Sequence, residues 1–415
     1  MSPQRLLNLS LMIILVLLVP ILYAGKGLAM LSDLHRREWG GADFTAYYTA
    51  ADLIAEGQNP YDTSLFASRA ANLGFRSDRP YIYPPFLAIA LIPLTLLPPQ
   101  GAALVWFGLN IGFLLLSLVL LSVSSGIHRH STHFLIFLLG ALTFYPVIFS
   151  LFVGQVNILV LFLLVLFWTF LEQRREALAG LALGAASMIK LLPLILGIFL
   201  LWKGRSRPAL WAVATMLSIL ALGTLLIGLE PHWAYLTSVL PTQYLQPHPL
   251  NQSLNGFLAR LLVASPGEPP RLWPWLPFLL SGLLLLTTFL LIPRGQADPR
   301  ITDAEVSFVV LAMLLISSVT WVATLVLLLL PYASIAKLPS KGSGRWLLAA
   351  GVLVSYLLIS TQRLVEMMIG GMTPGSSISP WALGLPLYGT AILWLTLAYL
   401  LMARTGGPGA RRHPV

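Results

Sequence analysis

Two cations of this chain stand in apolar surroundings, where a charged side chain is costly. Lys190 lies near the middle of an apolar run, residues 178–202, and a charge at such a position usually has a function. Arg260 ends the motif NQSLNGFLAR (251–260), whose apolar spacing predicts a short helix at a membrane interface. Lys190 in a dry cavity would suit a phosphate anion, and Arg260 would reach a lipid phosphate. The competing interpretation for both residues is that the side chain snorkels to the membrane surface.

One carboxylate, Asp43, opens a segment rich in aromatic residues, GADFTAYYTAADL (41–53). Aromatic and apolar residues, Tyr47 among them, recur there at helical spacing, which predicts a short amphipathic helix at the membrane interface. Asp43 would stand at or near the N-cap of this helix, and the competing interpretation is that it is only a cap. The next motifs, GQNPYD (57–62) and RPYIYPPF (79–86), carry residues typical of turns and helix starts.

Amides form a third group of candidate residues. The segment LFVGQVNILV (151–160) places Gln155 and Asn157 between two apolar runs. Amides beside a membrane cavity could bind a hydroxyl-rich ligand, or they could simply satisfy a turn. Weaker candidates for sugar or headgroup contacts are Tyr83, Asn251 and Gln252.

The sequence lacks the residues that several other kinds of chemistry require. The chain has no cysteine, which excludes disulfides and cysteine-based metal or redox sites. His128, His130 and His133 lie in a short basic loop and are predicted to be solvated, so no metal site and no cofactor is expected. There is no Walker loop, no GxGxxG and no nucleophile elbow, so ATP-driven transport and serine hydrolysis have no support.

Composition indicates what must position these residues. The chain has 415 residues, of which 57% are hydrophobic and 10% are charged, and its mean hydropathy is +0.83. Soluble domains carry about 25% charged residues, whereas apolar runs of about 20 residues match the hydrocarbon core of a bilayer. We therefore predict an all-α, polytopic membrane protein with about 11–13 transmembrane helices, some short or broken, in a single domain over residues 1–415. The apolar segments fall near 6–24, 83–98, 101–121, 133–151, 155–171, 178–202, 209–228, 272–292, 306–331, 346–362 and 381–402.

Charge distribution predicts the orientation of the chain. The net charge is +10, but 15 of the 25 Lys and Arg residues flank apolar runs, as the positive-inside rule expects, so a nucleic-acid partner is excluded. Arg5 places the N-terminus in the cytoplasm. Residues 25–82, which hold seven of the 15 acids, then form the first outer loop. A second outer loop is predicted over 229–271 and a cytoplasmic tail over 403–415.

Two apolar runs have basic residues on both flanks. Residues 178–202 lie between Arg174-Arg175 and Lys203, and 306–331 lie between Arg300 and a basic cluster formed by Lys337, Lys341 and Arg345. Each run also carries a break, at Lys190–Pro193 and at Ser317–Trp321. A pair of half-helices, with both flanks on the cytoplasmic side, would satisfy both flanks. The alternative is one long tilted span that violates the charge rule.

The order of these motifs resembles glycosyltransferase family 87, of the GT-C superfamily. The resemblance covers roughly residues 40–335. Its motifs are an Asp in the first outer loop, Y-x-x-A, G-x-x-PY and YPP, then GQxN, K-x-x-P and NQSLxGxxxR. Known members include polyprenol-phosphate-mannose-dependent mannosyltransferases.

This resemblance implies a reaction and roles for three residues. The donor would be a polyprenyl-phosphate sugar, with transfer at the outer face of the membrane. Asp43 matches the general base, and Lys190 and Arg260 match the lysine and arginine of the family motifs. One departure is that related proteins often carry one or two His shortly after Ser-Trp, and this chain has none in the residues that directly follow Trp321.

The chemistry of such a transfer also fits the residues themselves. A sugar on a phosphate already has a good leaving group, so one carboxylate and one or two cations would suffice. Without D-x-D or clustered acids, metal independence is expected, and a single displacement would invert the anomeric centre. We expect transfer of a hexose, mannose by resemblance, to a lipid or glycan acceptor. The short loops favour a bacterial plasma membrane, with the site facing the exterior.

Two other functions stay open. A transporter or flippase for lipid-linked sugars would use the same cavity and cations without needing Asp43. A non-catalytic family member that binds polyprenyl lipid would agree with the missing histidines.

Overall fold

The computed structural model describes residues 3–34, 41–75, 79–127, 131–243, 246–262, 275–294, 299–336, 343–362 and 379–405. Within these ranges the regular secondary structure is helical, with one isolated bridge between Asn251 and Trp321. The predicted all-helical class is confirmed. Predicted residues that lie outside the described ranges are His128, His130, Lys337, Lys341 and the tail from residue 406 onward.

The chain forms two compact units, each described here by itself. Unit 1 comprises Met1–Leu194 and Arg207–Tyr244, and unit 2 comprises Ile195–Ser206 and Leu245–Val415. The elements of unit 1 are α1 (Pro3–Ile13), η1 (Ile14–Leu18), α2 (Val19–Asp33), α3 (Ala42–Ala55), α4 (Thr63–Asn72), α5 (Pro85–Leu91), η2 (Ile92–Leu96), α6 (Pro99–Ser124), α7 (Thr132–Thr143), α8 (Tyr145–Val153), α9 (Asn157–Glu172), α10 (Glu176–Ile189), α12 (Ser206–Ile227), α13 (Glu230–Ala234), η3 (Tyr235–Val239) and η4 (Leu240–Gln243). Those of unit 2 are α11 (Leu194–Trp202), α14 (Leu254–Leu262), α15 (Leu276–Leu291), α16 (Pro299–Ile316), η5 (Val322–Leu328), α17 (Leu329–Ala336), α18 (Ser343–Ser360), α20 (Pro380–Leu383) and α21 (Leu385–Thr405).

Four described helices are long and apolar enough to cross a membrane: Gln4–Asp33, Pro99–Ser124, Ser206–Ile227 and Leu385–Met402. A fifth is added if α7 and α8, which meet at a bend of 45°, count as one span. Further apolar helices are 10–17 residues long, which is less than a full crossing requires. The prediction that some of the membrane helices are short or broken is confirmed, and the predicted number of 11–13 transmembrane helices stays a prediction.

Local sequence explains where the helices around the first loop begin and end. The Asp62 carboxylate caps α4 by accepting hydrogen bonds from the backbone N–H groups of Ser64 and Leu65. Pro84 is extended and Pro85 begins α5, a position where the missing proline N–H costs nothing. The turn after α3 places Gly57 at φ +72°. The predicted turn and helix-start roles of these motifs are confirmed.

Helix α3 is buried within unit 1. It packs against α4, α5 and η2, and most of its residues are inaccessible to solvent. Phe44 and Tyr47 are 0% exposed. The aromatic face of α3, expected at a membrane interface, therefore packs inside the protein.

The predicted break within residues 178–202 is confirmed. Helix α10 ends at Ile189, Lys190 has an extended backbone with φ −141° and ψ 134°, and α11 begins at Leu194. Pro193 cannot donate a backbone hydrogen bond and disfavours helix in the residues before it, which explains the break.

Within unit 1, helices α10 and α12 begin at the same end. A Cβ on Gly180 would come 2.6 Å from the carbonyl oxygen of Pro208, so the starts of α10 and α12 are in close contact. The Arg207 guanidinium lies 3.8 Å from the Glu176 carboxylate. The chain therefore returns to its starting end before α12 begins, as the flanking charges predicted and a single tilted span would not allow.

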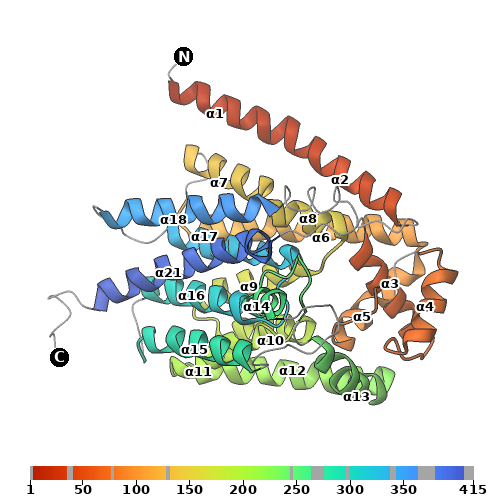
Figure 1. Ribbon diagram of the computed structural model, residues 1–415. Coiled ribbons are helices and arrows are strands. Elements are labelled where there is room, and N and C mark those ends of the chain that lie inside the picture. The colour runs from red at the N-terminus through yellow and green to blue at the C-terminus, as the bar shows by residue number, and fades with distance from the viewer. Residues whose placement is uncertain are drawn as a thin grey trace. The chain divides into compact units, whose positions relative to one another are not determined.

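In unit 2 the second predicted break is also present. Helix α16 ends at Ile316, and the chain resumes at Val322 in η5, a 3-10 helix. Helix α17 then packs back against α16, so the chain reverses at residues 317–321. Helices α18 and α21, which are drawn in blue in Figure 1, pack against each other, and α16 also packs against α21.

Candidate active site

Asp43 lies in the first turn of α3. The N-cap of this helix is Gly41, with φ +68° and no side-chain cap hydrogen bond, so the interpretation of Asp43 as the cap is wrong. The Asp43 side chain is 22% exposed. Its Oδ2 accepts a hydrogen bond of 3.0 Å from Nε2 of Gln155, and its Oδ1 lies 4.0 Å from a guanidinium nitrogen of Arg79. The carboxylate is thus held by an amide and a cation while part of it stays accessible.

The orientation of the Gln155 amide is set by its neighbours. Its Oε1 accepts hydrogen bonds from the Tyr47 hydroxyl at 2.6 Å, the Tyr83 hydroxyl at 2.9 Å and the Val156 N–H at 3.0 Å. Because these donors face Oε1, the amide must turn Nε2 toward Asp43. Gln155 is 1% exposed, so burial keeps this arrangement in place.

A close backbone approach brings α3 to Gln155. Gly154 has φ +71°, and a Cβ there would come 2.6 Å from the Cβ of Phe44, so only glycine fits this turn. The Gly41 N–H donates to the Phe152 carbonyl at 2.9 Å, and the Trp106 indole N–H donates to the Gly154 carbonyl at 2.8 Å. The glycine of the GQxN motif therefore docks the first turn of α3 on the turn between α8 and α9.

Lys190 lies at the break that follows α10. Its Nζ donates a 2.6 Å hydrogen bond to Oδ1 of Asn157 and lies 5.3 Å from the centre of the Tyr83 ring. Within the described ranges no carboxylate oxygen lies within 4.0 Å of this ammonium group. An ammonium group has three donors, so two remain for a ligand. The arrangement is a cation held by a neutral amide.

The electrostatics of the site suit a base. Burial raises the pKa of the Asp43 carboxyl above its ordinary value, and the charges of Arg79 and Lys190 and the Gln155 hydrogen bond oppose this rise. Burial also raises the pKa of Tyr47 and Tyr83, so both stay protonated hydrogen-bond donors. A carboxylate with a raised pKa accepts a proton more readily than one in water.

Arg260 lies in unit 2, in the last turn of α14. Its Nη1 donates to the carbonyl oxygens of His248 at 2.9 Å and Asn251 at 2.7 Å. Its Nε and Nη2 are buried and have no hydrogen-bond partner among the described residues. Burial lowers the pKa of Arg260 to about 10, which leaves it charged at neutral pH. Nε and Nη2 are the two donors of one guanidinium edge, the kind of edge that forms bidentate contacts with a phosphate or carboxylate.

Asn251 and Gln252 hold the backbone around the second break. The Asn251 side chain donates to the carbonyls of Gln246 and Ser318 and accepts from the Thr320 N–H, and it is 0% exposed. A Cβ on Gly256 would come 2.3 Å from the Asn251 side chain, which explains this glycine. Gln252 is 1% exposed and donates to the Pro249 carbonyl. The Asn251 amide is thus satisfied within the protein, whereas Oε1 of Gln252 is buried and has no hydrogen-bond partner among the described residues.

Sequence reasoning missed three residues of these regions. Arg79 opens RPYIYPPF, a motif in which sequence analysis singled out Tyr83 and the prolines but not the arginine. Asn255 donates to the carbonyls of Ile316 and Ser317 at the end of α16. The chain lacks a histidine shortly after Trp321, yet His248 packs edge-on against that indole with ring centres 5.0 Å apart. Within the described ranges no group of three potential metal ligands gathers.

Comparisons with known proteins give a family. The chain is 27% identical over 236 residues to a polyprenol-phosphate-mannose-dependent alpha-(1-2)-phosphatidylinositol pentamannoside mannosyltransferase of Mycobacterium tuberculosis, and the match spans 52% of this chain and 54% of that relative. Structures of ArnT from Cupriavidus metallidurans, with undecaprenyl phosphate and in the apo state, align over 93% of this chain and 78% and 77% of theirs, with TM-scores of 0.43 and 0.42 and identities of 15% and 14%.

The family match covers most of the candidate residues. The model for glycosyltransferase family 87 matches residues 81–318, which is more than half of the chain. It includes Tyr83, Gln155, Lys190 and Arg260, whereas Asp43 precedes it. The chain therefore belongs to glycosyltransferase family 87.

Proposed function

We propose that this glycosyltransferase transfers a hexose, mannose in the first instance, from a polyprenyl-phosphate sugar to a hydroxyl group of an acceptor. The observation that carries this proposal is the electrostatic coupling between Asp43 and Lys190, which are not in direct contact, in unit 1. A partly exposed carboxylate with a raised pKa stands within electrostatic reach of an ammonium group that has no direct carboxylate partner among the described residues. The sugar and donor class are suggested by the mycobacterial relative.

In the proposed reaction Asp43 takes the proton of the acceptor hydroxyl. The hydroxyl oxygen bonds to the anomeric carbon of the sugar, and the bond between that carbon and the phosphate oxygen breaks. The polyprenyl phosphate leaves with the bonding electrons, and the charge of Lys190 stabilises it. A single displacement inverts the anomeric centre, so a β-linked donor gives an α-linked product.

The amides and phenols have supporting roles in this proposal. Gln155 orients the Asp43 carboxylate, Tyr47 and Tyr83 orient Gln155, and Asn157 orients Lys190. Direct contacts of these groups with the sugar are a further part of the proposal. They would use the face of the site that Asp43 leaves accessible.

We propose that Arg260 binds a lipid phosphate, and this proposal is based on the hydrogen bonding of Arg260 alone. Its buried Nε–Nη2 edge lacks a partner in the described structure, and leaving two such donors unpaired is costly unless a ligand binds them. Asn251 and Gln252 would act through the backbone that surrounds Arg260, since Asn251 supplies one of the carbonyls that holds it. We place the site at the outer face of the membrane because the acidic first loop carries Asp43.

The test is a transfer assay with purified protein, labelled polyprenyl-phosphate mannose and a membrane lipid extract as the acceptor source. The proposal expects a labelled glycolipid that α-mannosidase cleaves. Bound donor without any covalent product would instead identify a lipid-binding protein. Labelled sugar lipid that crosses the bilayer of a liposome without transfer would identify a flippase.

A further inference from the structure

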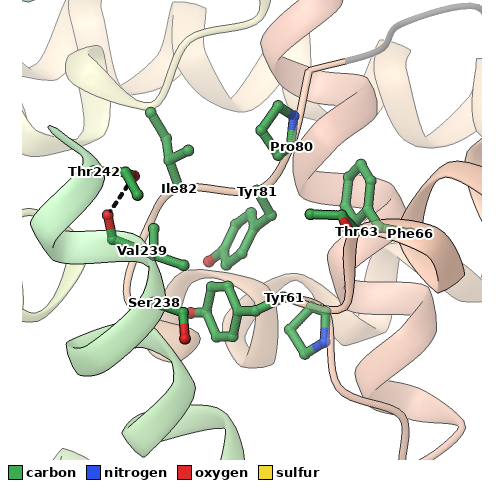
Figure 2. A pocket seen from close by; sticks show the side chains of 10 residues that line it. Tyr61, Thr63, Phe66, Pro80, Tyr81, Ile82, Ser238, Val239 and Thr242 are labelled. Carbon is green, nitrogen blue, oxygen red and sulfur yellow. Dashed lines mark hydrogen bonds between the residues drawn. The ribbon is translucent and has the colours of Figure 1, made fainter. Parts of the chain in front are cut away.

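Unit 1 contains a cavity separate from the Asp43 carboxylate. Its volume is about 200 Å³. Three segments form it: the start of α4 with the turn before it, the extended chain that precedes α5, and η3–η4 (Figure 2). The lining residues are Pro60, Tyr61, Thr63, Phe66, Pro80, Tyr81, Ile82, Ser238, Val239 and Thr242.

Two tyrosine rings shape this cavity. The rings of Tyr61 and Tyr81 lie 5.7 Å apart, tilted by 34° (Figure 2). Their hydroxyls are engaged elsewhere, because Tyr61 donates to the Tyr83 carbonyl and Tyr81 donates to the Pro84 carbonyl. The rings are therefore fixed, and they line the cavity with aromatic carbon rather than with free hydroxyl groups.

The remaining lining is neutral and carries small hydroxyl groups. Thr63 and Ser238 are exposed and contribute hydroxyls from opposite sides of the cavity (Figure 2). Among the residues that the structure describes, no charged side chain lines it. A phosphate would have no cation to pair with here, and an unpaired charge in such a site is costly. The lining thus favours a neutral ligand that combines an apolar face with hydroxyl groups.

Size narrows the ligand further. Pockets for drug-sized ligands measure about 300–1,000 Å³, so this cavity suits a group about as large as one sugar ring. A pyranose has an apolar C–H face that can lie on an aromatic ring and hydroxyls at its edge that can meet Thr63 and Ser238.

The cavity shares a chain segment with the Asp43 site. Pro80, Tyr81 and Ile82 line the cavity, while the neighbouring Arg79 lies 4.0 Å from Asp43 and Tyr83 donates to Gln155. The donor sugar is joined directly to a phosphate and needs a cation beside it, and the described lining of this cavity supplies none. We propose that the cavity is an acceptor subsite that binds a neutral sugar ring, which makes the acceptor a glycan. This inference rests on the proposed function.

The test measures binding without turnover. The probe is methyl α-D-mannopyranoside, and its binding to the full chain in detergent is followed by saturation-transfer NMR. Ser238→Trp should fill the cavity from an exposed position and weaken binding by about tenfold or more. Thr237→Trp, an exposed neighbour on η3 that does not line the cavity, is the matched control and should stay within about twofold. Thr63→Leu, on the opposite wall, should weaken binding by about threefold.

The outcomes separate the subsite from the proposed function. Unchanged mannoside binding in both Ser238→Trp and Thr63→Leu overturns the subsite, even if the wild type transfers mannose. If Ser238→Trp instead weakens binding of geranyl phosphate and leaves the mannoside unaffected, the cavity holds an isoprenoid chain and the proposal is wrong. Loss of mannoside binding in Ser238→Trp, with no transfer by the wild type, supports the subsite and contradicts the proposed function.

Discussion

Two lysines, Lys190 in unit 1 and Lys203 in unit 2, stand in apolar surroundings and are held in opposite ways. Lys203 is 2% exposed and forms a 3.0 Å ion pair with Glu305, which is 0% exposed, and it also donates to the Pro293 carbonyl. Lys190 is only partly buried and donates to the neutral amide of Asn157.

The difference lies in what neutralises each charge. Lys203 has its counter-ion within the protein, so its charge is satisfied when the chain folds. Lys190 has a neutral partner, and its nearest described acid, Asp43, acts on it at a distance. Burying a charge without an opposite charge beside it is unfavourable. Such a charge is therefore usually retained because it has a function. We infer that Lys203 stabilises unit 2 and that Lys190 binds an anionic group of the substrate.

The largest effect should follow from breaking the buried pair. Lys203→Met leaves Glu305 charged and unpaired, which should cost about 3–5 kcal/mol of folding stability. Thermal unfolding of the purified protein in detergent would measure the loss. The double variant Lys203→Met/Glu305→Leu removes both charges and should recover most of the stability. A double variant as unstable as the single one would show that the pair is not what stabilises this region.

Lys190→Met should separate activity from stability. Removing this cation should lower kcat for mannosyl transfer by about 10²–10³-fold, because the leaving phosphate loses its stabilising charge. The unfolding temperature should change little, since no buried carboxylate loses its partner. Unchanged kcat with a large loss of stability would show that Lys190 has the same structural role as Lys203, which would contradict the proposed difference between the two lysines.

A smaller effect is expected from the pH dependence of transfer. Because burial raises the pKa of Asp43, kcat/KM should fall with decreasing pH through a value above the ordinary 3.8 of an aspartate. The base works when deprotonated, so activity is present above this pKa and lost below it. Gln155→Leu removes a hydrogen bond that lowers the pKa, so the acid limb should move to higher pH. If the acid limb of the kcat/KM profile does not move in Gln155→Leu, Gln155 does not form a hydrogen bond with the group that titrates.

Sequence analysis identified the residues whose role can be recognised from their neighbours along the chain. Lys190 stands out because a charge interrupts an apolar run, and the basic flanks of 178–202 predict the reversal that the fold contains. Gln155 and Asn157 were recognised as polar residues between apolar runs.

Their partners were not predictable, because the contacts join distant positions. Glu305 is 102 residues from Lys203, and Gln155 is 112 residues from Asp43. Amides also look alike in a sequence. Asn251 is fully engaged by backbone groups and Gln155 aims a donor at a carboxylate, yet both read as polar residues beside apolar runs. Only tertiary packing distinguishes their roles.

The most direct test of the account compares two acids of the same helix. Asp43→Asn keeps the shape of the side chain but removes the base, whereas Asp52→Asn alters the acid that pairs with Arg69 at 3.2 Å on another face of α3. In the labelled mannose transfer assay we predict that Asp43→Asn lowers kcat by about 10²–10⁴-fold and that Asp52→Asn retains most activity. Full transfer by Asp43→Asn would contradict the central claim.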